Sequence, residues 1–363
     1  MNADFILAIG ELGKEKGIDP ELLFQAVEEA LVTAYKKNFG SNQNVRVDMN
    51  KVTGELHIYA QRHIVAEVGD DPNEISLEEA RKIDPRYEVD DIVETEVTPR
   101  NFGRIAAQNA KQVVVQRIRE AERGMVFEKF SSRENDIVTG IIQRMENKNV
   151  YIDLCKAEAI LTPNEQIPGE IYQYNDRMKT YIVEVKKTSK GPQIMVSRTH
   201  PGLLKRLFEL EVPEIHDGLV EIKSVAREPG MRSKISVYTK DENIDPVGAC
   251  VGHKGMRVQT IVNELRGEKI DIVKYSSEPD QYVANALSPA KVVSTEVLEE
   301  EKICRVIVPD YQLSLAIGKE GQNARLAAKL TGWKIDIKSE SQAAEEAEQG
   351  AQEVGVAYEA DED

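Results

Sequence analysis

The chain contains little of what disulfide-bonded and metal-binding proteins need. Its 363 residues include three cysteines, Cys155, Cys250 and Cys304, and five histidines. The cysteines are far apart and show no paired spacing, which argues against a disulfide framework and a zinc site and fits a reducing compartment. The histidines show neither the spacing of metal ligands nor partners for a catalytic triad. We therefore expect no metal site, no cofactor and a cytoplasmic protein.

Long apolar runs are also absent. No stretch approaches the roughly 18 consecutive apolar residues of a membrane span. The N-terminus lacks the basic start of a signal peptide. No Gly-x-x-x-x-Gly-Lys-Ser/Thr loop occurs, which argues against a GTPase. From the sequence we therefore expect neither a membrane span, nor a signal peptide, nor a GTPase.

The charge is strongly negative but unevenly distributed. The net charge is −16, which is unusual for a nucleic-acid binder. Residues 340–363 contain many Glu and Asp residues and neither Lys nor Arg. Because such a segment cannot bury enough apolar surface to order itself, we predict a disordered acidic tail over this range. The remainder is only mildly acidic, so its charge neither proves nor excludes an RNA-binding surface.

Residues 1–126 mix helix and strand patterns. Asp19-Pro20-Glu21 is a typical helix start, and apolar residues recur at helical spacing up to Phe39. The alternating runs VRVDMN and ELHIYAQRHIVAEV predict a hairpin, and Ser76 with Glu79 forms a capping-box pattern before another helix. A long helix from Arg104 is expected to link this mixed α/β domain to the next. Its apolar face would consist of Ala107, Ala110, Val114, Ile118 and Ala121.

Residues 131–200 contain five short strand patterns separated by turn residues. The patterns are IVTGIIQRME, NVYIDLC, AEAILT, YIVEVKK and QIMVSR. They predict a small closed barrel of OB type. Four tyrosines fall in this segment, namely Tyr151, Tyr172, Tyr174 and Tyr181. They could stack unpaired bases or pack in the core or rim of the barrel, and the sequence leaves both interpretations open.

Residues 201–339 contain a duplicated unit. Each copy, over 201–276 and 277–339, has patterns for a helix, two strands, a helix, a Gly-x-x-Gly turn, a second helix and a final strand. Each second helix ends at a glycine and is followed by Ile-Asp-Ile. A third glycine pair, Gly10 and Gly13, lacks this context and is given no functional weight. Two copies of one supersecondary unit indicate a duplicated domain.

The two Gly-x-x-Gly turns have the chemistry of a phosphate clamp. Glycine lets a nucleic-acid backbone approach closely, and the N–H groups of a loop at a helix start favour an anion. A KH domain holds about four nucleotides in this way. Because Glu320 partly cancels Lys319, we expect the second loop to hold phosphate less strongly. The candidate RNA-binding residues are Gly252, His253, Lys254, Gly255, Arg257, Gly318, Lys319, Glu320, Gly321 and Arg325, together with Arg198.

Taken in order, these modules resemble the NusA family of bacterial transcription factors. Long phrases carry the resemblance up to about Ser339, including PRNFGRIAAQNAKQVVVQRIREAER, RTHPGLLKRLFELEVPEI, VAREPGMRSKISV, DPVGACVGHKGMRVQTIVNELRGEKIDI and AIGKEGQNARLAAKLTGWKIDI. The resemblance implies a multidomain α+β chain. After the N-terminal domain would come an S1-type OB barrel and two tandem type II KH domains, each with the order α-β-β-α-α-β.

The resemblance also implies a function. Residues 1–126 would bind RNA polymerase, and the barrel and KH domains would grip nascent single-stranded RNA. The factor would promote pausing and termination or, with other antitermination factors, antitermination. We further expect a monomer with no membrane partner. Some family members carry acidic repeats after the KH pair; since this chain has only a short acidic tail, the role of those repeats is not transferred to it.

Two other functions compete with this interpretation. KH and OB modules accompany some exoribonucleases, but their catalytic cores need far more chain than remains here. Asp271 and Asp336 alternate with isoleucine and fit the outer face of a strand better than a catalytic pair, so we expect no enzyme. A ribosomal protein is the second alternative, since one KH type occurs in the small subunit, but such proteins are usually strongly basic.

Overall fold

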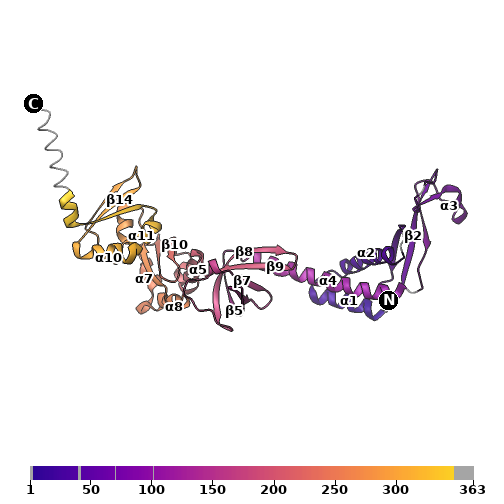
Figure 1. The fold of residues 1–363 in the computed structure, drawn as a ribbon, viewed down its shortest axis with the longest axis horizontal. Helices are drawn as coiled ribbons and strands as arrows, with labels where there is room; N and C mark the ends of the chain where they lie inside the picture. Colours follow the sequence, from indigo (N-terminus) through magenta and orange to yellow (C-terminus); the bar gives the residue numbers. More distant parts are fainter. Residues whose placement is uncertain (1–2, 40–41, 70, 101, 347–363) are drawn as a thin grey trace, which may run out of the picture. The chain divides into compact units, whose positions relative to one another are not determined.

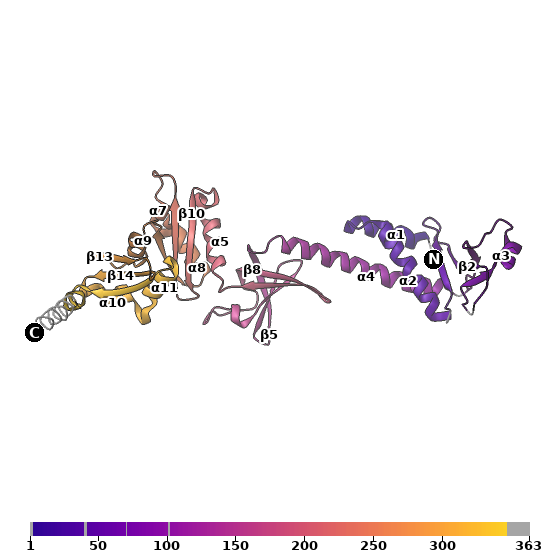
Figure 2. The same ribbon diagram turned by 90° about the horizontal axis from the view of Figure 1, so that it is seen from above.

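The computed structural model describes residues 3–39, 42–69, 71–100 and 102–346 (Figures 1 and 2). The chain divides into two compact units, Met1–Glu128 and Lys129–Asp363. None of the helices in the described ranges combines the length and apolar character needed to cross a bilayer.

The first unit combines helices with a four-stranded sheet. Its elements are α1 (Ala3–Lys16), α2 (Pro20–Phe39), β1 (Asn44–Met49), β2 (Leu56–Val65), β3 (Glu74–Ser76), α3 (Leu77–Ile83), β4 (Ile92–Glu96) and α4 (Phe102–Ser131). β2 pairs antiparallel with β1 and β4 and parallel with β3, which confirms the predicted hairpin. The Ser76 side chain caps α3 by accepting from the Glu79 N–H. Gly10 and Gly13 lie inside α1, so the third glycine pair forms no turn.

The long helix α4 packs on this unit in a register slightly different from the predicted one. Its buried side chains include Phe102, Ala106, Ala110 and Val114, whereas Ala107 is exposed. Phe102 sets this register because its ring is fully buried and meets the ring of Tyr35 edge-on at 5.9 Å. The predicted apolar face was therefore wrong at Ala107, which is exposed. Alanine is compatible with both the buried and the exposed face of a helix, so its residue type did not decide between them.

A closed five-stranded barrel follows in the second unit. Its strands are β5 (Ile137–Glu146), β6 (Asn149–Asp153), β7 (Glu158–Leu161), β8 (Arg177–Thr188) and β9 (Gly191–Ser197), with the short helix η1 (Pro163–Glu165) between β7 and β8. They close in the order β5-β6-β7-β9-β8, with β7 and β9 parallel. Alternating residues such as Val150, Ile152 and Val196 point inward and are fully buried. The five predicted strands and the closed barrel are confirmed.

Two KH units with the same topology complete the described chain. The first contains α5 (Pro201–Glu211), α6 (Pro213–His216), β10 (Val220–Glu228), β11 (Arg232–Thr239), α7 (Pro246–Val251), η2 (His253–Gly255), α8 (Met256–Glu264) and β12 (Lys269–Lys274). The second contains α9 (Pro279–Ala286), β13 (Ser294–Leu298), β14 (Ile303–Val308), η3 (Asp310–Gln312), α10 (Leu313–Ile317), η4 (Lys319–Gly321), α11 (Gln322–Thr331) and β15 (Lys334–Ser339). In each sheet the first two strands are antiparallel and the last two parallel. The predicted order α-β-β-α-α-β is confirmed.

The predicted acidic tail begins later than expected. Residues 340–346 are helical, so the expectation of disorder from residue 340 is wrong for this stretch. The Ser341 hydroxyl donates to Asp310 Oδ2 at 3.0 Å, and Lys338 pairs with Glu346. These contacts stabilise the helical stretch at residues 340–346, which the acidic composition did not predict. The rest of the predicted tail lies outside the described residues.

A buried ion pair anchors the first KH sheet close to the end of the barrel. Arg227 donates from Nε and Nη2 to the two carboxylate oxygens of Glu268, both at 2.9 Å, and neither side chain is exposed. Glu268 also accepts from the Ser233 hydroxyl and the Gly230 N–H. Arg227 Nη1 donates to the carbonyl of His200, directly after the barrel. Burial alone would raise the pKa of Glu268, but the bonds from Arg227, Ser233 and Gly230 outweigh it, so the pKa lies below its ordinary value.

The second KH unit packs on the sheet of the first. Lys234 Nζ donates to Asp271 Oδ2 and to the carbonyl of Ser288, both at 2.9 Å, and the Lys234 side chain is fully buried. Ala226 and Val273, on the same sheet, belong to the apolar core of the second unit. Barrel and KH units thus share buried contacts from end to end.

Because of the buried Arg227–Glu268 ion pair, we expect the junction between the barrel and the first KH sheet to be sensitive to acid. Replacing Glu268 with Ala leaves Arg227 buried without a carboxylate, so the free energy of unfolding should fall by about 3–5 kcal/mol at neutral pH. Because the folded pKa of Glu268 is lowered, its contribution is present above pH 4.5, the ordinary value, and is lost as the pH falls below it. Hydrogen exchange of the β11 amides as a function of denaturant and pH measures both effects. The exposed Glu299→Ala variant is the control, and equal stability of the two variants would contradict the assignment.

Candidate nucleic-acid interface

The two Gly-x-x-Gly turns have almost the same backbone. The first glycines, Gly252 and Gly318, have φ/ψ of 74/177° and 76/172°. At the third positions, Lys254 and Glu320 have φ/ψ of 51/27° and 53/28°. The last glycine of each turn is also left-handed, and α8 or α11 begins at the next residue. The duplication seen in the sequence is therefore a duplication of loop geometry.

The first and last glycines serve different purposes. A Cβ on Gly252 would lie 2.6 Å from Arg257 Cγ, and one on Gly318 would lie 2.8 Å from the Asn323 backbone nitrogen. Hence the absence of a Cβ at each first glycine lets the loop pack against the helix that follows it, α8 or α11. A Cβ on Gly255 or Gly321 would meet nothing within 4 Å, so these sites need glycine for their positive φ and leave the loop open outward.

Half of the loop amides are already bonded within the protein. The N–H of Gly252 donates to the Gly248 carbonyl at 2.9 Å, and that of Gly255 donates to the Gly252 carbonyl at 3.1 Å. Gly318 and Gly321 repeat this pattern with Ser314 and Gly318 as acceptors. In the described chain, the N–H groups of the two middle residues of each loop have no protein acceptor. These are the amides at which an anion can bind, next to the positive end of the helix dipole.

The exposed loop side chains differ in charge. His253 and Lys254 in the first loop, and Lys319 and Glu320 in the second, are exposed. Among the ion pairs of the described residues, none includes His253, Lys254 or Lys319. The first loop therefore presents one lysine and one histidine, whereas the second presents one lysine and one carboxylate.

Arg257 and Arg325 brace the loops. Arg257 Nη1 donates to Glu214 Oε2 at 2.9 Å and to the Ala249 carbonyl at 2.6 Å. Arg325 donates from Nε to Glu228 Oε1 at 2.6 Å and from Nη1 to the carbonyl of Glu320 at 3.1 Å. Each guanidinium is thus paired with a carboxylate inside the protein. Their charge is less available to RNA than the sequence suggested.

Asn323 is a supporting residue that the sequence analysis missed. It stands five positions after Gly318, as Arg257 stands after Gly252. Its buried side-chain amide donates to the carbonyls of Ala316 and Leu287, both at 3.0 Å. Arg257 and Asn323 therefore both bond a carbonyl at the end of the preceding short helix, where such groups lack helical partners. Because their side chains differ, aligning the two loops by residue type conceals this shared role.

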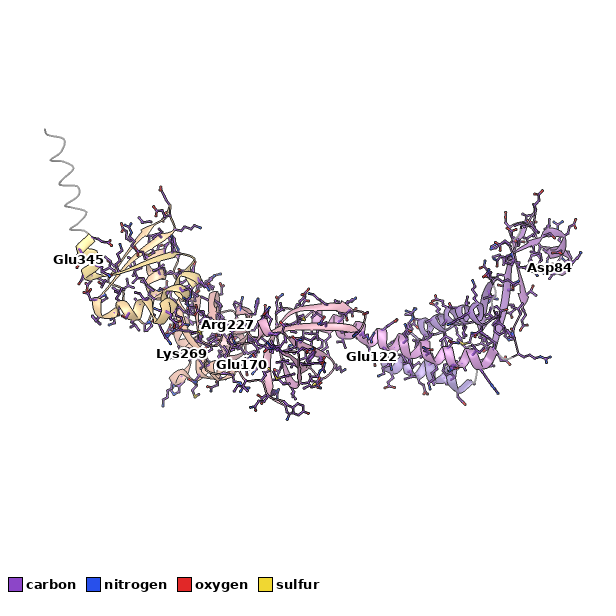
Figure 3. The ribbon with its side chains drawn as sticks, viewed as in Figure 1. Asp84, Glu122, Glu170, Arg227, Lys269 and Glu345 are labelled. Atoms are coloured by element: carbon purple, nitrogen blue, oxygen red, sulfur yellow. The ribbon has the colours of Figure 1, made fainter. Side chains whose placement is uncertain are left out.

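The structure corrects the assignment of Arg198. Its side chain is fully buried and has no surface with which to contact RNA. Nη2 donates to Glu170 Oε1 at 2.5 Å and to the Glu264 carbonyl at 3.0 Å, and Nη1 donates to the Lys179 carbonyl at 2.9 Å. Glu264 also accepts from the Lys179 backbone N–H and ammonium group. Since Glu264 is the last residue of α8, Arg198 joins the barrel to the end of α8 that lies opposite the first loop. Glu170, the carboxylate partner of Arg198, is labelled in Figure 3.

The four barrel tyrosines separate into distinct environments. Tyr181 is buried and stacks on His200 with ring centroids 4.4 Å apart. The Tyr172 hydroxyl donates to Glu170 Oε2 and accepts from the Ile167 N–H. Tyr174 is 80% exposed, and Tyr151 lies half-buried beneath the Arg144 guanidinium at 4.0 Å. Of the four, Tyr174 is thus the exposed tyrosine with a ring available for stacking.

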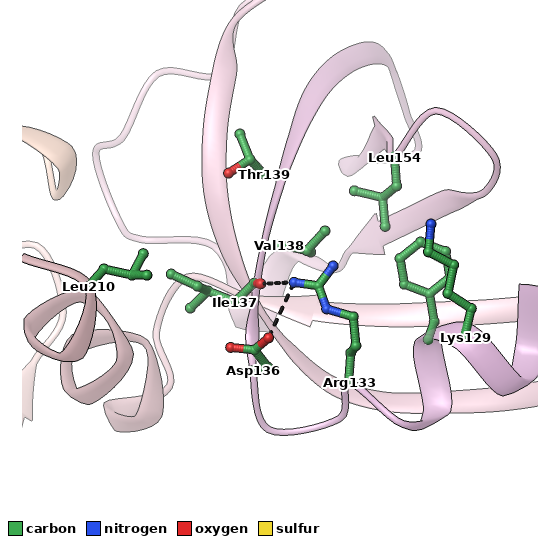
Figure 4. A pocket seen from close by; sticks show the side chains of 9 residues that line it. Lys129, Arg133, Asp136, Ile137, Val138, Thr139, Leu154 and Leu210 are labelled. Atoms are coloured by element: carbon green, nitrogen blue, oxygen red, sulfur yellow. Dashed lines mark hydrogen bonds and ion pairs between the residues drawn. The ribbon is translucent and has the colours of Figure 1, made fainter. Parts of the chain in front are cut away.

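A pocket at the start of β5 has no catalytic arrangement (Figure 4). Its volume is about 430 Å³, and apolar side chains of Phe130, Ile137 and Leu154 contribute to its lining. Its carboxylate, Asp136, pairs with Arg133 at 3.2 Å, and Arg133 also donates to the Ile137 carbonyl. Across the described ranges, no three His, Cys, Asp or Glu side chains gather as a metal site.

Four family models match successive parts of the chain. They are the NusA N-terminal domain at residues 4–124, the S1 RNA binding domain at 131–197, the NusA-like first KH domain at 198–275 and the NusA-like second KH domain at 279–345. A solution structure of the N-terminal domain of NusA from Bacillus subtilis is 55% identical, covers 34% of this chain and 99% of that one, and has a TM-score of 0.31.

Curated relatives match nearly the whole chain. A protein of Halalkalibacterium halodurans is 66% identical over 95% of this chain and 90% of its own length. One from Bacillus subtilis is 64% identical over 95% and 93%, and one from Thermus thermophilus is 42% identical over 92% and 89%. Each is named transcription termination/antitermination protein NusA. Near-complete coverage at these identities, with the barrel and twin loops in the expected order, shows that this chain belongs to the NusA family.

Proposed function

We propose that this protein binds RNA polymerase through residues 1–126 and nascent single-stranded RNA through its barrel and KH units. In this role it modulates pausing, termination and, with other antitermination factors, antitermination. The names of its relatives and the S1 and KH models support a role in transcription with RNA as a ligand. We also propose that it acts in the cytoplasm, as a monomer and without enzymatic activity.

The observation that carries the RNA proposal is the repeated loop geometry. Both loops offer unbonded amides at the start of a helix, and both present an exposed lysine. Such groups bind phosphate whatever the base, so the loops hold and position an RNA backbone. We assign the stronger grip to the first loop, because Glu320 in the second repels the phosphate that Lys319 attracts.

The buried contacts between modules support binding of one continuous RNA segment. Arg198 links the barrel to α8, and Lys234 lies beneath the second KH unit. When binding sites are fixed relative to one another, occupation of one raises the effective concentration of RNA at the next. Modest individual contacts can therefore add up to tight binding of a long strand, despite the net charge of −16.

The enzyme alternative is tested directly. Incubation of labelled RNA with the protein and magnesium should leave the RNA at full length. Shortened products that persist through purification and disappear with a loop variant would identify a nuclease and overturn the proposal of a non-enzymatic factor.

The first loop should dominate the electrostatic part of RNA binding. Replacing His253 and Lys254 with Asp should weaken binding of unrelated single-stranded RNAs by about tenfold or more and flatten the dependence of affinity on salt. Polymerase binding should be retained, since it is assigned to residues 1–126. Titrations of fluorescent RNA at several salt concentrations measure the affinity and slope. Unchanged values of both would rule out this loop as a phosphate site.

The second loop should gain affinity when its carboxylate is reversed. Glu320→Lys places a lysine at the position that Lys254 occupies in the first loop, in the same backbone conformation. RNA affinity should rise by about three- to tenfold at low salt, and the salt slope should steepen by about 1. Glu299→Lys makes the same charge change on an exposed turn and is the matched control. Equal gains in RNA affinity from both variants would indicate a general effect of charge and would contradict a phosphate site at the second loop.

Separate pieces of the chain test which unit binds RNA polymerase and which binds RNA. Pieces comprising residues 1–128 and 129–363 follow the two compact units. The first should retain RNA polymerase in a pull-down and not RNA, and the second should retain single-stranded RNA. Ribosome sedimentation of the full chain tests the ribosomal alternative. Polymerase retention by the second piece alone would contradict the assignment.

A further inference from the structure

The first turn of α11, which follows the second loop directly, is hydrogen-bonded to the first KH unit. Helix α11 packs against β10 of that unit (Figure 1). Glu228 is the last residue of β10. Its Oε1 accepts from Arg325 Nε at 2.6 Å, and its Oε2 accepts from Gln322 Nε2 at 2.8 Å. One carboxylate of the first unit therefore holds the start of the helix that carries the second loop.

The charge of Glu228 acts mainly on Arg325. The Glu228 side chain is 16% exposed, and the hydrogen bond from Arg325 is the main cause that lowers its pKa, so it is a carboxylate at neutral pH. Lys329, one turn further along α11, attracts it more weakly. Arg227 and Arg232, which lie on the first sheet close to Glu228, are each bonded to another carboxylate. Arg325 is thus the main cationic partner of Glu228.

Arg325 also lies beside the second loop. Its Nη1 donates to the carbonyl of Glu320 at 3.1 Å, and its side chain is 49% exposed. The guanidinium is therefore next to the loop residues whose N–H groups have no acceptor within the described protein. From this position its charge acts on a phosphate bound at the loop. Because Glu228 contacts the same guanidinium at 2.6 Å, a carboxylate offsets that charge before any RNA binds.

The first loop is braced differently. Counted from the first glycine of each loop, Gln259 stands where the second loop has Arg325. Gln259 donates to Asn263 on its own helix. Arg257, which braces the first loop, pairs with Glu214 of the same unit. In the part of the chain that the structure describes, an ion pair between a loop helix and the neighbouring KH unit is thus a feature of the second loop.

We propose that Glu228 of the first KH unit sets how strongly the second loop binds RNA phosphate, by keeping Arg325 in an ion pair between the two units. The inference rests on the proposed RNA binding and specifies how this loop is controlled. A phosphate at the loop competes with Glu228, because the charge of one guanidinium is then shared between two anions. Glu228 is a positioning residue, since it acts on the phosphate through Arg325.

The competition connects RNA binding with the contact between the two KH units. When Arg325 turns to a phosphate, Glu228 loses its main partner and α11 loses one of these two bonds to β10. The buried contact between Lys234 and Ser288 is not affected, so the units stay together. By linkage, a change that loosens the Glu228 contact strengthens phosphate binding at the second loop, and phosphate binding loosens the contact.

A double-mutant cycle in the full chain tests the proposal. Glu228→Gln keeps an acceptor oxygen and removes the charge. The affinity for labelled oligouridine should therefore rise by about three- to fivefold at low salt, and the salt slope should steepen by about 0.7. Arg325→Gln should lower the affinity by about twofold in the parent chain and by about fivefold in the Glu228→Gln chain, where the guanidinium is free of the carboxylate. Glu299→Gln, at an exposed turn, makes the same charge change and should not alter the cost of Arg325→Gln.

NMR of the unmodified chain provides a test that needs no change at Glu228. The Nε–H signal of Arg325 is assigned by its loss in Arg325→Gln. Oligouridine should shift this signal, with a midpoint that matches the affinity measured by titration. The Nε–H of Arg227, buried in its pair with Glu268, should not shift and so reports that the fold is intact.

Two results would overturn the inference alone. Equal costs of Arg325→Gln in the parent and Glu228→Gln chains would show that Glu228 does not act through Arg325. An Arg325 Nε–H signal that stays in place while oligouridine saturates the chain would show that no phosphate competes for the guanidinium. In both cases RNA still binds and the proposed function stands. A parent chain that bound no oligouridine would overturn the proposed RNA binding and this inference together.

Discussion

The geometry of the barrel and KH units depends on buried charges whose partners come from different modules. Arg198 belongs to the end of the barrel, yet it is bonded to Glu170 of the barrel and to the carbonyl of Glu264 in the first KH unit. A buried guanidinium separated from these acceptors would be left without solvation, which is strongly unfavourable. The modules therefore cannot separate without exposing or stranding this charge, and the orientation of α8 relative to the barrel is fixed.

The proposed RNA-binding surface depends on where the charges lie in the fold and not on the net charge of the protein. Most arginines near the loops are neutralised within the fold, as Arg257 is by Glu214 and Arg325 is by Glu228. Lys254 and Lys319, which belong to none of the ion pairs of the described residues, lie at the loop tips beside the unbonded amides. Local field, and not net charge, determines whether a phosphate binds at such a site.

The secondary-structure elements and their order could be predicted from local sequence patterns. The environments of individual side chains could not, because they depend on packing between residues far apart in the sequence. The barrel strands and both KH units carry periodic apolar residues and turn signals, so their order could be predicted. Arg198 ends an alternating strand, and no local pattern shows that the next module will cover it. Gly252 looked like a point of close approach to RNA, but its missing Cβ faces Arg257, a contact that depends on how the helix folds back. Helix α1 went unpredicted because Gly10 and Gly13 interrupt its pattern.

The left-handed backbone at Lys254 and Glu320 has a consequence for how ligands arrive. A non-glycine residue in this region is disfavoured by about 1 kcal/mol, so it persists only where the surrounding structure enforces it. Here the bonds from Arg257 and Asn323 to the preceding helices do so without a ligand. The loops are therefore preorganised: a phosphate that bound at the proposed site would find the backbone already in place, so little chain entropy would be lost on association and no slow induced fit would be needed.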